Sequence, residues 1–73
     1  MLIQYTVEQE DNRAALTITP SHPINGFFGC RIVVENVPLD QADEFLHERV
    51  RWKLGQELGA DYLDTGAVTV ERI

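Results

Sequence analysis

The amino-acid sequence predicts an α+β fold, a two-layer sandwich with one helix packed on a mixed or antiparallel sheet. Two observations predict it: four short runs with the alternation of half-buried strands, and one long segment with helical spacing. The elements follow the order β-β-β-α-β, which favours separate layers of strands and helix. Because the chain contains no linker, internal repeat or low-complexity tract, we expect residues 1–73 to form one small domain.

The first two expected strands form a hairpin. Residues 2–8 alternate apolar and polar side chains, and residues 14–19 repeat the alternation. The short polar segment between them contains Asp11 and Asn12, which are favourable turn residues. Two alternating runs joined by such a turn are typical of an antiparallel hairpin, and Pro20 closes the second strand.

Residues 20–29, PSHPINGFFG, form the longest irregular stretch, and they carry two adjacent aromatic residues, Phe27 and Phe28. One interpretation is that one ring fills the core while the other covers a sheet edge. The other is that one ring lies on an exposed loop tip as a binding anchor, since loops commonly carry function. We interpret His22 as an ordinary loop residue.

The third and fourth expected strands flank the helix. Residues 30–37 are rich in β-branched side chains and predict a strand with one face toward solvent. Residues 55–66 are ambiguous between a short helical continuation and a single helical turn, with breaks at Gly59 and Gly66. Residues 67–73 predict the last strand, but the pattern leaves the order of strands in the sheet open.

The helix is expected over residues 39–54, LDQADEFLHERVRWKL. Pro38 disfavours helix in the residue before it, so the helix begins after this proline. We expect Asp40 to be the N-cap, with Leu39 as a hydrophobic staple. Gly55 is the expected end, with Gly59 as the second candidate, because glycine commonly follows the last turn of a helix.

The helix presents two apolar surfaces when its residues are placed at steps of about 100°. Phe45 and Trp52 lie on one flank, and Arg49 and Lys53 separate them from an aliphatic row on the other. That row consists of Ala42, Leu46, Val50 and Leu54. Two cations in the centre of a single buried face would be costly, so we expect the aliphatic row to face the core and the aromatic side to face something else.

The chain is acidic, with 12 Asp and Glu against 6 Lys and Arg and a net charge of −6. This balance argues against direct nucleic-acid binding, which requires cations to replace phosphate counterions. An acidic surface serves solubility, or it faces a basic partner. In the second case it imitates nucleic acid and blocks a protein that binds it.

The sequence also bears on location. The N-terminal residues 1–11 lack the basic start and apolar run of a signal peptide, and no stretch approaches the length of a membrane span. The single cysteine excludes an intramolecular disulfide and fits a reducing compartment. We therefore expect a cytoplasmic protein without membrane contact.

The chain shows no glycine-rich phosphate loop, metal-ligand spacing or nucleophile motif, so we predict no catalytic residue, cofactor or metal. Cys30 lies in a β-branched strand and is expected to be a small core residue. The alternative is a small thiol enzyme or ligand carrier in which Cys30 is paired with His22 or His47 by the fold.

We predict instead a protein–protein interaction module. The expected binding residues are Phe45, Arg49, Trp52 and Lys53 on the helix, together with Phe27 and Phe28. Trp and Arg are enriched at binding hot spots, and Arg49 is placed to stack on either aromatic ring. The alternative is that Trp52 packs on the sheet margin, or against Phe27 and Phe28, with Arg49 shielding it. The expected partner is a protein, including a second copy, because a domain this small gains stability from a homodimer.

No family motif is recognised in the chain. The expected element order is similar to that of several small host-takeover and inhibitor proteins of bacteriophages, in which a few strands carry one helix. This resemblance implies an inhibitor or adaptor of the phage or mobile-element type. It involves architecture alone, so no functional residue is carried over from it.

Overall fold

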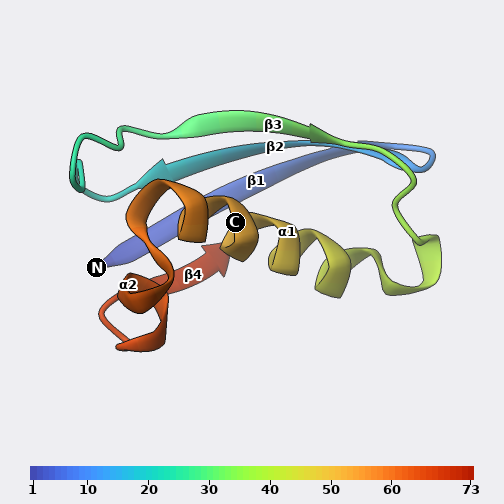
Figure 1. Cartoon of the computed structure of the whole chain (residues 1–73). Coiled ribbons are helices and arrows are strands. Elements are labelled where there is room, and N and C mark those ends of the chain that lie inside the picture. Colours follow the sequence, from blue (N-terminus) through green and yellow to red (C-terminus); the bar gives the residue numbers. More distant parts are fainter.

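The computed structural model describes residues 1–73 and has the expected α+β architecture, with one main helix packed on a four-stranded mixed sheet (Figure 1). The strands are β1 (Leu2–Glu10), β2 (Arg13–Pro20), β3 (Cys30–Val34) and β4 (Thr69–Arg72). Between β3 and β4 lie the 3-10 turn η1 (Leu39–Gln41), the main helix α1 (Ala42–Leu58) and the short helix α2 (Ala60–Asp64).

The strand order in the sheet is β3-β2-β1-β4. β1 and β2 form the expected antiparallel hairpin, with Glu10 opposite Arg13, and β3 pairs antiparallel with β2. β4 pairs parallel with β1, so the connection through α1 and α2 passes from one edge of the sheet to the other. The two edge strands are therefore β3 and β4.

The core lies between α1 and one face of the sheet. From the strands, Ile3, Tyr5, Leu16 and Ile18 are almost fully buried. From the helix, the aliphatic row buries Leu46, Val50 and Leu54, while Ala42 packs against the cluster. The opposite face of the sheet carries exposed threonines on β1 and β2, in keeping with the period-two pattern of the sequence.

The expected helix start is wrong by three residues, because α1 begins at Ala42 and not at residue 39. Residues 39–41 form a 3-10 turn in which the Gln41 N–H donates to the Pro38 carbonyl at 3.1 Å. This turn draws Asp40 inside it, so Gln41 takes the N-cap position of α1, without a side-chain cap hydrogen bond. Leu39 is 67% exposed and does not act as a staple.

Of the two glycines expected to end the helix, Gly55 is wrong and Gly59 is confirmed, because α1 continues to Leu58. The chain leaves the helix at Gly59, which has φ 93° and donates its N–H to the Gly55 carbonyl. A positive φ suits glycine, and Gly55 shows none. The extra turn means that no basic residue lies in the last turn of α1. The segment 55–66, which the sequence left open between a continuation and a separate turn, contains both: α1 continues to Leu58, and α2 follows as a short helix of its own.

The loop before β3 separates its two aromatic rings. Phe27 is 6% exposed and belongs to the core, where Ile24 and Phe27 form an isolated bridge, whereas Phe28 is 75% exposed. The interpretation that one ring fills the core is thus confirmed for Phe27. The third strand ends at Val34 and not at residue 37, because Asn36 takes φ 58° and turns the chain toward η1.

No helix in the structure has the length and apolar character needed to cross a membrane.

Candidate interaction surface

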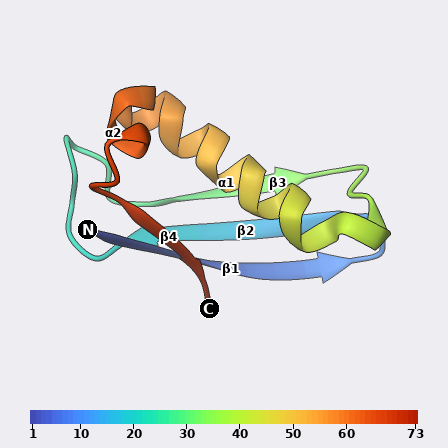
Figure 2. The same cartoon turned by 90° about the horizontal axis from the view of Figure 1, so that it is seen from below.

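α1 crosses the sheet diagonally (Figure 2). Its N-terminal half lies over β1 and β2, and its C-terminal half, together with α2, projects past β3. The projecting half still buries Val50 and Leu54 on its inner side. The outer side of this half therefore overhangs the free edge of the sheet.

The aromatic side of α1 lies on this overhang. Trp52 is 55% exposed, while Phe45 is half-buried and packs against the margin of the core. The Arg49 guanidinium lies 5.6 Å from the Phe45 ring centroid and 5.5 Å from that of Trp52. Arg49 therefore makes a cation–π contact with both rings, each of the kind that contributes about 0.5–1 kcal/mol at exposed sites.

An open groove of about 350 Å³ separates α1 from the edge of β3. One wall consists of residues 32–35 at the end of β3. The other consists of the helix residues Arg49, Trp52, Lys53 and Gln56. Trp52 also borders a second hollow on the side of α2, so the indole ring forms a ridge between two depressions. The predicted helix residues Arg49, Trp52 and Lys53 are thus brought together at one groove.

The backbone of β3 is unpaired along this groove. The two-residue turn makes Glu10 and Arg13 a hydrogen-bonded pair, and the alternation then directs the N–H and C=O groups of Leu16 toward β3. Leu16 pairs with Ile32, so Ile32 faces inward, whereas the backbone groups of Arg31 and Val33 face outward. None of the backbone hydrogen bonds outside the sheet and helices involves Arg31 or Val33.

The charges around the groove are partly neutralised within the chain. Lys53 forms an ion pair with Glu57 at 3.1 Å, and Arg13 forms one with Glu35 at 3.6 Å. Arg31 is exposed and takes part in no ion pair. Arg49 also forms no ion pair, and its guanidinium stacks on the two aromatic rings. Arg31 and Arg49 are therefore the cations without an ion pair at this edge, while the unpaired Glu8 and Glu10, which line the same hollow as Arg31, lie two strands away on β1.

The remaining predicted binding residues do not all join this surface. Phe27 is buried and is removed from the candidate surface, because a ring in the core cannot contact a partner. Phe28 is exposed, but it precedes the first residue of β3, whereas the groove is lined by residues 32–35 at the other end of this strand. From here on, the interaction surface means Phe45, Arg49, Trp52 and Lys53 with the β3 edge at residues 31–35.

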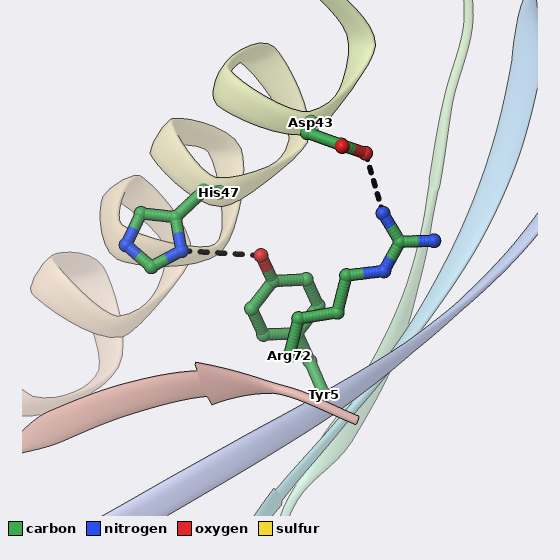
Figure 3. A network of polar contacts seen from close by, with 4 residues as sticks. All are labelled: Tyr5, Asp43, His47 and Arg72. Atoms are coloured by element: carbon green, nitrogen blue, oxygen red, sulfur yellow. Dashed lines mark hydrogen bonds and ion pairs between the residues drawn. The ribbon is translucent and has the colours of Figure 1, made fainter.

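Polar contacts hold the other side of α1 to the sheet (Figure 3). The Tyr5 hydroxyl and His47 Nδ1 form a hydrogen bond at 3.1 Å, and Arg72 on β4 forms an ion pair with Asp43. Burial raises the pKa of Tyr5 above its ordinary value; the nearby Arg72 opposes this effect, and Asp43 adds to it. Tyr5 is therefore a neutral hydrogen-bonding group that joins β1 to the helix.

The cysteine alternative gains no support from its surroundings. Cys30 is partly buried on the helix side of β3, and burial raises the pKa of its thiol, an effect that Lys53 opposes and Glu57 reinforces. A raised thiol pKa lowers the thiolate fraction that a nucleophile needs. His47 bonds to Tyr5 on β1, and His22 lies exposed in the loop after β2. No group of three or more His, Cys, Asp and Glu side chains is arranged to hold a metal ion.

The sequence did not indicate the backbone part of the surface, namely the β3 edge at Arg31 and Val33. Whether a strand lies at an edge depends on the strand order, which the pattern of one chain leaves open. The mixed outer face of this strand was the available signal, since central strands carry fewer charged side chains.

Comparison of the chain with protein-family models, with curated proteins and with solved structures found no match.

Proposed function

We propose that the protein is a non-enzymatic protein–protein interaction module that binds through the interaction surface. The observation that supports the proposal is the exposed Trp52 ring, which borders the groove beside an unpaired strand edge. A large aromatic ring left outside the core is the residue type most enriched at binding hot spots. The surrounding aliphatic row already forms the core, so the fold does not need this ring for its interior.

Arg49 explains how the surface stays soluble without a partner. Its guanidinium covers parts of both aromatic rings and presents its charge to water. A partner that binds here gains the apolar area of the rings, which contributes about 25 cal/mol per Å² buried. The same guanidinium is available to a carboxylate of the partner as a bidentate donor.

The proposed partner is a protein, and a second copy is one candidate. Each copy carries a net charge of −6, so two copies repel each other when they associate. A different protein with a lower net negative charge would meet less repulsion. The role that we propose is that of a small inhibitor or adaptor, which needs only a compact binding surface. The free thiol of Cys30 fits a reducing compartment and supports a cytoplasmic location.

The proposal is tested with Trp52→Ala. We expect the variant to keep its far-ultraviolet circular dichroism and a cooperative urea transition, and to lose at least about tenfold in affinity for a partner identified with the unchanged protein. The matched control is Leu39→Ala, which removes a side chain of similar exposure in η1, away from the groove. A variant that unfolds, or that binds as well as the control, contradicts the proposal.

The salt dependence of the same complex separates this proposal from the acidic-surface alternative. Binding through Trp52 buries apolar area, so the part of the affinity that Trp52→Ala removes should change little between low and moderate ionic strength. Imitation of nucleic acid against a basic partner weakens steeply over that range, because exposed charges are screened over about 10 Å at 0.1 M salt. The control variant Leu39→Ala keeps its affinity under both hypotheses. The salt series is therefore interpreted together with Trp52→Ala, which loses affinity only under the proposed function.

A further inference from the structure

We infer that the groove takes an extended acidic segment of the partner protein, which adds to the sheet as a fifth strand at the outer edge of β3. The inference rests on the proposed function and specifies its partner chemistry. It is carried by three features that meet at one place: unpaired backbone groups, an overhanging aromatic wall and unneutralised arginines.

The strand edge supplies the affinity of such a complex. The N–H and C=O groups of Arg31 and Val33 point away from β2 and have no partner within the chain. β3 contains no proline, and no strand of this chain pairs with its outer edge, so an extended peptide can continue the ladder. Strand addition of this kind uses main-chain hydrogen bonds for affinity and pockets for alternate side chains for specificity.

The overhang of α1 makes the site suited to a single strand. Figure 2 shows the C-terminal half of α1 and α2 projecting past β3, over the position that an added strand takes. If two copies joined antiparallel through β3, their helices would lie on the same face of the continuous sheet. The projecting half of each helix would then meet the helical layer of the other copy, whereas a bare strand brings no helix with it.

The charges select an acidic strand. Three of the six basic residues, Arg13, Lys53 and Arg72, form ion pairs with carboxylates of this chain. Two of the remaining three lie on either side of the β3 edge. Arg49 lines the groove on the helix side, and Arg31 lies on the open face of β3, in a hollow that Glu8 and Glu10 of β1 also line. An added strand with carboxylates therefore meets a free cation on each of its faces, and a basic strand meets repulsion.

The alternation of a strand defines the side-chain pattern of the occupant. Residues opposite Arg31 and Val33 point to the open face, where a carboxylate fits Arg31 and an apolar group fits Val33, which is itself 48% exposed. The residue opposite Ile32 points to the helix side, into the groove beside Trp52. The expected segment thus mixes acidic with β-branched or aromatic residues and contains no proline in its centre.

The experiment uses a capped peptide of roughly eight residues with the repeat Glu-Val-Val-Glu, which places both a carboxylate and an apolar side chain on each face of the strand. The matched peptide has lysine in place of each glutamate. Binding is followed by the fluorescence of Trp52, the only tryptophan of the chain. Amide exchange of the full-length protein is followed by NMR. We expect saturable binding of the glutamate peptide and slower exchange of the Arg31 and Val33 amides in the complex.

Two variants test the contacts. Arg31→Glu should weaken the glutamate peptide about tenfold and favour the lysine peptide, because attraction at this position becomes repulsion. Arg51→Glu produces the same change in net charge away from β3 and should leave the affinity unchanged. Val33→Pro removes an outward N–H that no strand of this chain uses, so it should abolish peptide binding while the fold remains.

The outcomes are distinguishable from failure of the proposed function. Equal binding of both peptides, no binding of the glutamate peptide, or binding without protection of the Arg31 and Val33 amides overturns the strand-addition inference. So does a dimer in light scattering that Val33→Pro dissociates, because the occupant is then a second copy. If a partner depends on Trp52 but is indifferent to Arg31→Glu and Val33→Pro, the proposed function stands and this inference fails.

Discussion

The two edges of the sheet differ in how α1 meets them. At the β4 edge the helix is held by the Tyr5–His47 hydrogen bond and the Asp43–Arg72 ion pair, and β4 itself covers β1. At the β3 edge the helix projects beyond the sheet, and the strand keeps unpaired backbone groups. The two halves of α1 therefore differ in their contacts. The N-terminal half makes the polar contacts that attach the helix to the sheet, and we propose that the outer side of the C-terminal half binds a partner.

The largest effect is expected from removing a buried side chain on the inner side of the projecting half of α1. Leu54→Ala removes a fully buried side chain, and we expect it to lower the free energy of unfolding by about 2–5 kcal/mol. Trp52→Ala, two residues earlier on the outer side, should cost less than about 1 kcal/mol because the ring is already exposed. Urea denaturation of both variants measures the contrast, and equal losses would show that the two sides of the helix are not distinct.

A milder change tests the fastened edge. Tyr5→Phe keeps the buried ring but removes the hydroxyl that bonds His47, so we expect a loss of about 0.5–1.5 kcal/mol in the free energy of unfolding. The binding affinity at the β3 groove should stay unchanged, since the hydroxyl lies on the other side of the helix. A Tyr5→Phe variant that unfolds as the parent does would show that the hydrogen bond contributes nothing to the attachment.

Alkaline pH distinguishes the two edges by titration. The pKa values of Cys30 at β3 and Tyr5 at β1 are raised by burial above their ordinary values of 9.0 and 10.0. The unfolded chain loses these protons first, so the stability they contribute is complete below about pH 9 and falls as the pH rises through the folded pKa values. Urea midpoints measured from pH 8 upward should decline, with Cys30→Ala removing the earlier part and Tyr5→Phe the later part. A flat profile for the unchanged protein would contradict the burial of both groups.

The helix shows how far a single sequence predicts such a molecule. The 3.6-residue spacing correctly separated Leu46, Val50 and Leu54 from Trp52, because burial follows directly from helical periodicity. The start was wrong because capping depends on local competition, and the Pro38 carbonyl accepts a 3-10 hydrogen bond from Gln41. The sequence offered two glycines for the end, and Gly59 rather than Gly55 takes the positive φ. These choices depend on where the chain must go next.

The site shows the corresponding limit. Arg49 and Trp52 were predicted to lie together because they share one helix, and the structure places the Arg49 guanidinium 5.5 Å from the Trp52 ring centroid. Phe27 was wrongly included, since nothing local distinguishes it from Phe28, and only the packing of the loop against the core decides which ring is buried. The β3 edge is a property of strand order, and strand order comes from the crossover that brings β4 beside β1.

Quenching of the single tryptophan by acrylamide tests the central claim most directly. If the outer side of α1 is a binding surface, acrylamide should quench Trp52 in the folded protein to a substantial fraction of the extent found in the urea-unfolded chain, because the ring is 55% exposed and Arg49 covers part of it. A bound partner should protect it. Strong protection of the indole in the free protein would place the ring in the interior and contradict the account. Quenching that a bound partner leaves unchanged would place the binding surface elsewhere.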